Sequence, residues 1–240
     1  MQRIFIVLLF FCSLIPFNAG ATQQQNQIAA VSSALAMHYP KIIFQQINAT
    51  PVAGIYEVVV ENGEIIYFAP ATGHIFVGEL WSADARNLTR DSKDRLLSAK
   101  LGLFPLDKAI KIGDGPNQVI EVTDPDCPFC RQSSEFFAAR EDTTRYVFLF
   151  PLDRIHPQAA AKARYILSAE DPELAYEEVF SGMYDNQPLP DVKDNGLLEI
   201  HRQVAAQIGI NGTPRFWING QHIAGYNPQE FEKLLNKTSE

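Results

Sequence analysis

The sequence predicts an α+β protein: a small helix-plus-antiparallel-sheet segment, then a larger segment in which strands and helices alternate. Three observations carry this prediction. Short runs of β-branched and aromatic residues fill residues 42–80, a charge-dense helical stretch follows, and strand and helix patterns alternate after Pro105. With 46% hydrophobic and 20% charged residues, the chain has the composition of a globular protein rather than a disordered one.

The net charge of −8 at pH 7 argues against a general affinity for nucleic acid, because binding to phosphate backbones needs a basic surface. No run of Lys or Arg indicates an anionic membrane surface either. We therefore expect no nucleic-acid partner.

Residues 1–21 are typical of a secretory signal peptide. Arg3 precedes an apolar run that reaches Phe17, and Ala19-Gly20-Ala21 supplies the small residues of a cleavage site. The run is short for a membrane span, so an uncleaved anchor is the weaker alternative. We expect export and cleavage after Ala21.

Residues 22–83 form the expected first domain. Helical spacing of apolar residues predicts an amphipathic helix over residues 24–38, ending before Pro40. Four strands are expected over residues 42–47, 55–60, 65–68 and 74–80. Asn62-Gly63 is a strong hairpin signal between the second strand and the third. So small a unit is marginal as a core of its own.

Residues 84–104 are predicted as one helix that links two domains, the alternative being a surface helix of a single domain. Residues 105–240 then begin with a buried strand over 118–122, which leads into Cys127-Pro128-Phe129-Cys130 and a helix over 131–140. Further elements are expected as a strand over 144–150, helices over 157–169, 172–181 and 195–208, strands at 215–218 and 222–223, and a helix over 228–235. A C-x-x-C motif at the start of a helix, in this order of elements, indicates a redox domain of thioredoxin type.

Cys127 and Cys130 are the cysteines that remain once the signal peptide is removed. A bridge that closes so small a loop removes little chain entropy, which disfavours an inert structural disulfide. Structural zinc wants four ligands, and the five histidines are scattered singly. We therefore expect a redox-active pair and neither a metal nor a cofactor.

The start of a helix stabilises a thiolate, because unpaired N–H groups and the helix dipole face the sulfur. Cys127 occupies that position and is the expected nucleophile. Cys130 is the second, more protected cysteine of the pair.

The mature chain resembles the bacterial periplasmic disulfide isomerases, the DsbC/DsbG family. The resemblance lies in the C-x-x-C motif after a strand, in Gly212-Thr213-Pro214 before the closing hairpin, and in the small N-terminal domain with its helical linker. It implies a thioredoxin-like catalytic domain with a helical insertion and a cystatin-like N-terminal dimerisation domain. It also implies a cis bond before Pro214, beside the cysteines. We expect Phe129, Thr213 and Pro214 to bind substrate.

The chain departs from the family pattern in two places. It lacks the second, structural cysteine pair that is usual in the isomerase branch. Its central dipeptide is Pro-Phe, closer to the Pro-Tyr of the G branch than to Gly-Tyr.

Glu121 interrupts an apolar strand, six residues before Cys127. Many thioredoxin-fold proteins carry a buried carboxylate at that offset, which implies a role in moving the proton of the second cysteine. A carboxylate in a dry site suits proton transfer near neutral pH. The alternative is an exposed glutamate on an edge strand with no role.

The function expected first is that of a dimeric disulfide isomerase or reductase in the periplasm. Thr213 before Pro214 favours it over a net dithiol oxidase, where a valine is typical, and the third candidate is a redox-linked chaperone. The resemblance implies misoxidised exported proteins as substrates, a homodimer, and a membrane thiol reductase of the DsbD type as electron donor.

Overall fold

The computed structural model describes residues 19–237, which form two compact units that divide between Gly78 and Glu79. The predicted signal peptide falls almost wholly on residues 1–18, outside the described part. Among residues 19–237, every helix is too short or too polar to cross a lipid bilayer.

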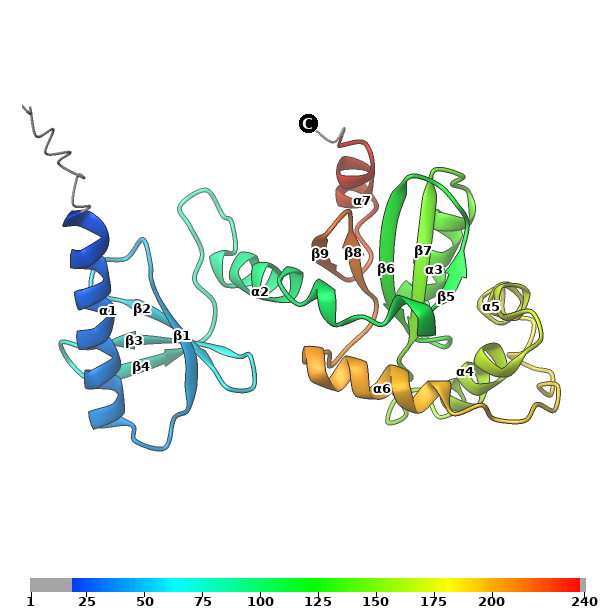
Figure 1. Cartoon of the computed structure of the whole chain (residues 1–240), viewed down its shortest axis with the longest axis horizontal. Helices are drawn as coiled ribbons and strands as arrows, with labels where there is room; N and C mark the ends of the chain where they lie inside the picture. Colours follow the sequence, from blue (N-terminus) through cyan, green and yellow to red (C-terminus); the bar gives the residue numbers. More distant parts are fainter. Residues whose placement is uncertain (1–18, 238–240) are drawn as a thin grey trace, which may run out of the picture. The chain divides into compact units, whose positions relative to one another are not determined.

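The N-terminal unit is one helix packed on a four-stranded antiparallel sheet, in the order β1-β2-β3-β4 (Figure 1). Its elements are α1 (Ala19–His38), β1 (Phe44–Ala49), β2 (Tyr56–Val60), β3 (Ile65–Ala69) and β4 (His74–Val77). Apolar residues of α1 meet the sheet at the predicted spacing, since Val31 and Leu35 are buried against Val58 and Phe68. The helix, the four strands and their pairing confirm the α+β prediction for this segment.

Local chemistry explains the ends of these strands. Gly63 has a φ of +81°, and its N–H donates to the Val60 carbonyl oxygen at 2.9 Å, which closes the predicted Asn62-Gly63 hairpin turn. The fourth strand is shorter than predicted and ends at Val77. Leu80, which was expected in that strand, instead donates its N–H to the Thr89 hydroxyl at 2.7 Å.

The C-terminal unit is built on a five-stranded mixed sheet in the order β5-β7-β6-β8-β9. Its strands are β5 (Ile110–Ile112), β6 (Asn117–Thr123), β7 (Thr143–Leu149), β8 (Arg215–Ile218) and β9 (Gln221–Ala224). β6 lies at the centre, parallel to β7 and antiparallel to β8. β5 was not predicted, because a run of three residues is too short to give a strand pattern.

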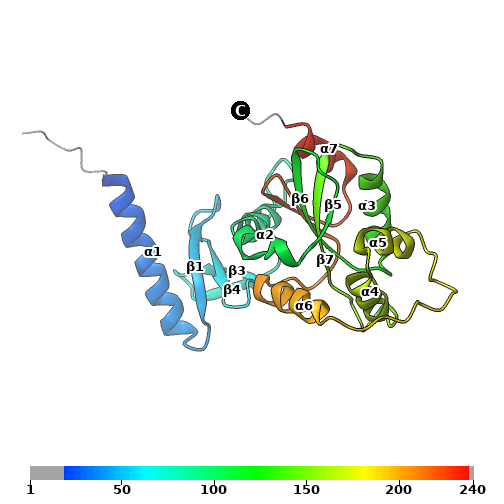
Figure 2. The same cartoon turned by 45° about the vertical axis from the view of Figure 1, so that its right-hand side comes forward.

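Helices cover both faces of this sheet (Figure 2). They are α3 (Pro128–Ala138), α4 (Ala159–Ser168), α5 (Pro172–Phe180), α6 (Leu197–Ile208) and α7 (Pro228–Leu235). The face that carries Ile120 and Trp217 packs against α6. The face that carries Val119 and Phe216 packs against α3 and α7, while α4 and α5 cover the β7 side. α4 to α6 form the predicted helical insertion between β7 and β8.

The helix predicted over residues 84–104 is shorter in the structure, where α2 spans Leu88–Ser98. The side-chain oxygen of Asn87 caps it by accepting from the Arg90 N–H at 2.9 Å. α2 packs on β9 and belongs to the C-terminal unit. Its role as a linker stays a prediction.

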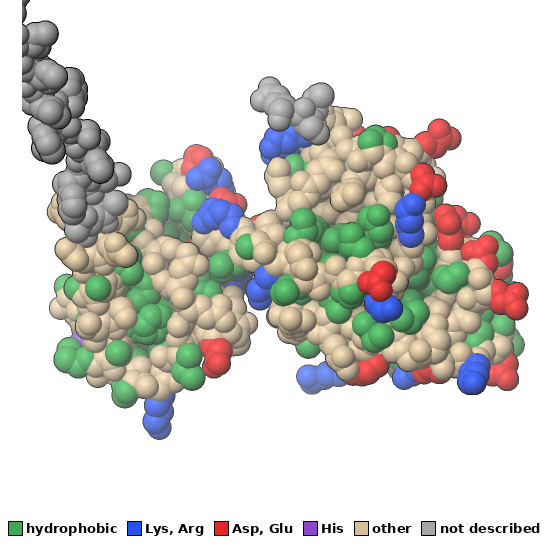
Figure 3. All heavy atoms as spheres, in the orientation of Figure 1, with side chains coloured by type: hydrophobic (Ala, Val, Ile, Leu, Met, Phe, Trp, Pro, Cys, Tyr) green, Lys and Arg blue, Asp and Glu red, His purple; other side chains and the backbone are tan. Residues whose placement is uncertain are grey.

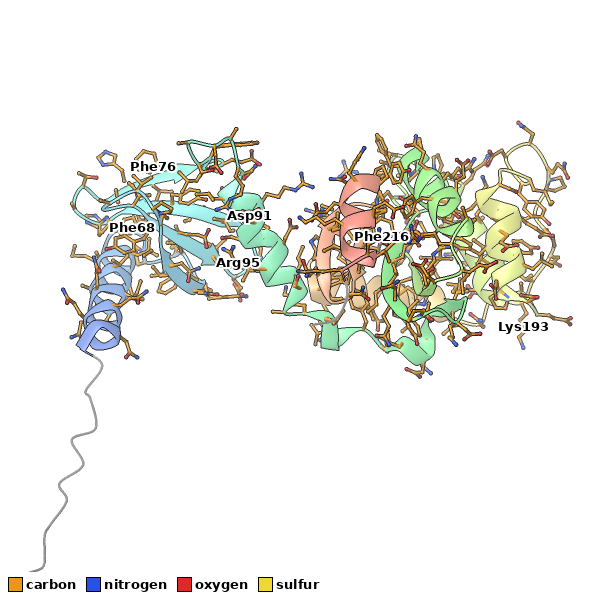
Figure 4. All side chains as sticks on the ribbon, turned by 90° about the horizontal axis from the view of Figure 1, so that it is seen from above. Phe68, Phe76, Asp91, Arg95, Lys193 and Phe216 are labelled. Carbon is orange, nitrogen blue, oxygen red and sulfur yellow. The ribbon has the colours of Figure 1, made fainter. Side chains whose placement is uncertain are left out.

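Apolar side chains are visible on the surface of both units (Figure 3), and among the described residues the two most exposed large ones lie in the N-terminal unit. These are Val77 and Met37, which are 84% and 72% exposed. Phe68 and Phe76, both labelled in Figure 4, show the contrast within one sheet, because Phe68 is fully buried and Phe76 is exposed.

Candidate active site

The C-x-x-C motif lies where β6 leads into α3. Cys127 is the N-cap residue of α3 and Pro128 is its first residue, a position that needs no N–H donor. The Cys127 N–H donates to the Asp124 carbonyl oxygen at 3.1 Å, which fixes the turn between strand and helix. Both cysteines are free thiols in this structure.

The two thiols have opposite electrostatic environments. The pKa of Cys127 is lowered to about 6, first because the Cys130 thiol hydrogen-bonds to its sulfur, and then because the N–H groups of Cys130 and Phe129 point at it. Partial burial opposes this effect without overcoming it. Burial raises the pKa of Cys130 well above its usual value, and its bond with Cys127 adds to the rise. The pair therefore holds one thiolate and one thiol near neutral pH.

The loop before β8 brings a distant segment against Cys127. The Thr213–Pro214 bond is cis, as the resemblance implied. The Cys127 thiol donates to the Thr213 carbonyl oxygen, with 3.8 Å between sulfur and oxygen. Phe129, the other predicted substrate-binding residue, is 58% exposed on the first turn of α3.

Glu121 lies on the central strand β6 and is fully buried, so the exposed edge-strand alternative is wrong. Its carboxylate is paired, however, since Arg145 donates to it at 2.7 Å and the Tyr176 hydroxyl at 3.3 Å. Arg145 also lies over the Tyr176 ring, 5.2 Å from its centroid. The structure brings Glu121 to an ion pair inside the fold, and its role as a proton carrier stays a prediction.

Asp124, for which no role was predicted, is fully buried in the turn that leads to the motif. Its carboxylate accepts from the Asp126 N–H at 2.8 Å and from the Leu152 N–H at 2.7 Å. The His156 ring nitrogen Nδ1 lies 2.9 Å from it. The carboxylate therefore joins the active-site turn to the segment after β7.

An ion-pair network involves the residues on either side of the motif, Asp126 and Arg131. Arg131 binds Asp185 through two nitrogens, at 2.5 and 2.6 Å, and reaches Asp126 at 3.3 Å. Lys162 on α4, almost fully buried, lies 2.6 Å from both Asp126 and Asp185. The bond with Arg131 lowers the pKa of Asp185. The network ties the residues that flank the two cysteines to the helical insertion.

Sequence reasoning missed Lys162 and Asp185, because nothing in their local sequence marks them. A partial signal was the placement of charged Asp126 and Arg131 on either side of the C-x-x-C motif, which calls for partners. Within the described residues, no group of three or more His, Cys, Asp or Glu side chains is placed to hold a metal ion.

Two family models match the chain. One, described as the N-terminal domain of the disulfide bond isomerase protein, matches residues 21–90. The other, a thioredoxin-like domain, matches residues 105–239.

Several thiol:disulfide interchange proteins are similar to this chain over most of its length. The thiol:disulfide interchange protein DsbC of Pasteurella multocida is 29% identical over 75% of this chain and 79% of its own length. The probable DsbC of Bordetella parapertussis is 26% identical over 88% of this chain and 75% of its own. The crystal structure of a disulfide interchange protein from Neisseria gonorrhoeae is 31% identical, with a TM-score of 0.48 over 56% of this chain and 97% of that one.

Proposed function

Because the chain belongs to the DsbC family of thiol:disulfide interchange proteins, we propose that it rearranges or reduces incorrect disulfide bonds in exported proteins. The observation that carries this proposal is the inequality of the two thiols. A lowered pKa at Cys127 and a raised one at Cys130 give one nucleophile and one reserve thiol.

The reaction starts when the Cys127 thiolate attacks a substrate disulfide. A mixed disulfide forms, and one substrate sulfur leaves as a thiolate. In isomerisation, another substrate thiolate attacks the mixed disulfide and expels Cys127, so no electrons are transferred overall. In reduction, Cys130 attacks the Cys127 sulfur, the substrate leaves with two electrons, and the enzyme holds a disulfide.

Phe129, Thr213 and Pro214 are the residues we propose to hold the substrate. The exposed ring of Phe129 offers an apolar contact beside the nucleophile. Thr213 lies next to the Cys127 sulfur. The Thr213 carbonyl is well placed to orient a peptide segment whose sulfur has bonded to Cys127.

The N-terminal unit supports an isomerase over a net oxidase. Residues 22–83 are proposed as a dimerisation domain, since they match the N-terminal domain of a disulfide bond isomerase and carry exposed apolar side chains. We infer a homodimer in the periplasm, substrates that are misoxidised exported proteins, and a membrane thiol reductase as the source of electrons. An enzyme that must be kept reduced needs such a donor, because each reductive turnover leaves a Cys127–Cys130 disulfide.

The test is refolding of a small protein whose disulfides have been scrambled. The mature chain should restore its native activity under a mildly reducing glutathione buffer, and a Cys127→Ser variant should not. A matched Cys130→Ser variant should keep part of the isomerase activity but lose reduction. Oxidation of reduced substrate without rearrangement would identify an oxidase instead. If a variant with both Cys127→Ser and Cys130→Ser restored as much native activity as the parent, the protein would be a chaperone.

A further inference from the structure

Two buried hydroxyl groups beside the cysteines are unsatisfied. Within residues 19–237, the buried side-chain polar atoms without a hydrogen-bond partner are Thr123 Oγ1, Thr213 Oγ1 and His222 Nε2. Most buried polar groups in native proteins are paired, so such an exception calls for an explanation. Thr213 lies on the Cys127 side of the pair, whereas Thr123 lies on the Cys130 side.

Thr123 is held rigidly at the end of the central strand. It is the last residue of β6 and is fully buried. Its carbonyl oxygen accepts from the Phe150 N–H at 2.7 Å, and its Cα pairs with Leu149 on β7. The backbone at Thr123 is therefore fixed, and its buried side chain has no access to water.

The sulfur of Cys130 has little to stabilise a negative charge. Cys130 is fully buried, and the Asp124 N–H, one residue after Thr123, donates to its sulfur at 3.4 Å. Burial and the charge of Cys127 raise the pKa of Cys130, and the nearby Thr123 hydroxyl and the Asp124 N–H are the groups that lower it. A thiolate here needs every donor that the site offers.

We propose that the Thr123 hydroxyl is a further catalytic group, which donates a hydrogen bond to the Cys130 sulfur as it becomes a thiolate. This inference rests on the proposed function, because it concerns the step in which Cys130 resolves the mixed disulfide. In the resting thiol state the hydroxyl has no partner, and it gains one when the charge forms. The hydroxyl thus stabilises the Cys130 thiolate that forms during resolution, and it does not stabilise the resting thiol.

In the resolving step, Cys130 gives up its proton, which ends in solvent, and its thiolate attacks Cys127 Sγ. This forms the Cys127–Cys130 bond and breaks the bond from Cys127 to the substrate. The substrate leaves as a thiolate and takes up one proton. The enzyme dithiol is oxidised by two electrons and the substrate disulfide is reduced by two. Isomerisation does not use the Cys130 thiolate, so Thr123 sets how long a substrate stays attached and free to rearrange.

Ellman's reagent separates attack from resolution in single-turnover experiments. Attack by Cys127 releases one coloured thiolate at a rate that depends on reagent concentration, and resolution by Cys130 releases a second at a rate that does not. Thr123→Val keeps the shape of the side chain and removes the donor. We expect it to leave the first phase unchanged and to slow the second about tenfold or more.

Matched variants make the result specific. Thr123→Ser should restore the second phase, because the hydroxyl is kept. Thr144→Val, which removes a buried threonine hydroxyl near the other end of the sheet, should leave both phases unchanged. The reduced Thr123→Val protein should melt no lower than the parent, since it loses an unpaired buried hydroxyl.

Two results with the variants overturn the inference. One is a second phase in Thr123→Val that is as fast as in the parent. The other is a second phase that is slow in Thr123→Ser as well as in Thr123→Val. Either result means that the hydroxyl does not assist Cys130. If the parent itself shows no second phase, Cys130 does not resolve mixed disulfides, and the proposed reductive step fails together with the inference. The parental trace alone therefore tells these two failures apart.

Discussion

Among the described residues, the N-terminal unit carries the two most exposed large apolar side chains, Val77 and Met37, whereas the C-terminal unit buries a paired Glu and Arg in its interior. Val77 on β4 is 84% exposed, and Phe76 beside it is 52% exposed. In the C-terminal unit, Glu121 and Asp124 are fully buried and Arg145 nearly so. The contrast is one of degree, because the C-terminal unit also exposes Ile155 and Phe129.

The two patterns suit different roles. Exposed apolar side chains gain free energy only when something else covers them, which fits a segment whose role is association. Buried charges cost desolvation and persist only when they are paired, as Glu121 is with Arg145. One of the buried charges of the C-terminal unit, Asp124, lies in the turn that leads to Cys127, which fits a segment whose role is chemistry.

The largest effect is expected at the nucleophile. Cys127→Ser should lower the rate of disulfide exchange by about a thousandfold or more, since a hydroxyl near neutral pH is a far poorer nucleophile than a thiolate. In the parent, alkylation of Cys127 should follow a titration with a midpoint near pH 6, because the deprotonated form reacts. Peptide mapping after limited alkylation across pH measures it. Labelling of Cys130 ahead of Cys127, or a midpoint near 9, would refute the assignment.

Glu121→Gln tests the buried charges of the C-terminal unit. It leaves the Arg145 guanidinium without its counter-charge in a dry site, so we expect the free energy of unfolding to fall by about 3 kcal/mol. Urea denaturation measures the change, with Glu177→Gln, an exposed position on α5, as the control. A loss below about 0.5 kcal/mol would show that the pair contributes little.

The same variant tests the proton-carrier hypothesis for Glu121. If the carboxylate carries the Cys130 proton, resolution should slow and its pH dependence should flatten, while attack by Cys127 changes less. An unchanged pH–rate profile would leave Glu121 with a structural role in the ion pair.

Val77→Glu tests the exposed apolar surface of the N-terminal unit. A charge at this position costs little in a single chain, because Val77 is exposed there. In a dimer that uses β4 the charge would be buried, so the dissociation constant of the dimer should rise about tenfold or more. Sedimentation at micromolar concentration measures it, and Ile155→Glu, at an exposed apolar position of the C-terminal unit, is the matched control that should leave the dimer unchanged. A monomeric parent would contradict the proposed dimer.

The smallest effect concerns acid stability. Burial lowers the pKa of His201 and His222, so these histidines are protonated at a lower pH in the folded chain than in the unfolded chain. Stability from these residues is therefore present above the ordinary histidine pKa of about 6.5 and is lost as the pH falls below it. Between pH 7 and pH 5, the free energy of unfolding of His222→Gln should depend less on pH than that of the parent. His74→Gln, an exposed position on β4, should keep the parental dependence.

Much of the fold was predictable because its signals are local. The Asn62-Gly63 turn, the apolar spacing of α1 and the strand runs before and after the C-x-x-C motif each reflect backbone preferences within a few residues. The errors arose where local signals were weak or misleading. β5 has three residues, and the charge-dense stretch before Leu88 has good helix formers but forms a turn that ends at the Asn87 cap.

The α+β class, the order of the two segments and the place of the cysteine pair at a helix start could be predicted from patterns along the chain, and the nucleophilic role of Cys127 stays a prediction from the same patterns. What surrounds the pair could not be predicted in this way. Arg145 and Tyr176, which bind Glu121, lie 24 and 55 residues away from it, and Thr213, which contacts Cys127, lies 86 residues away. Burial and pairing at those distances depend on how the strands and the helical insertion pack, because the energy of a charge is set by its neighbours in space rather than in sequence.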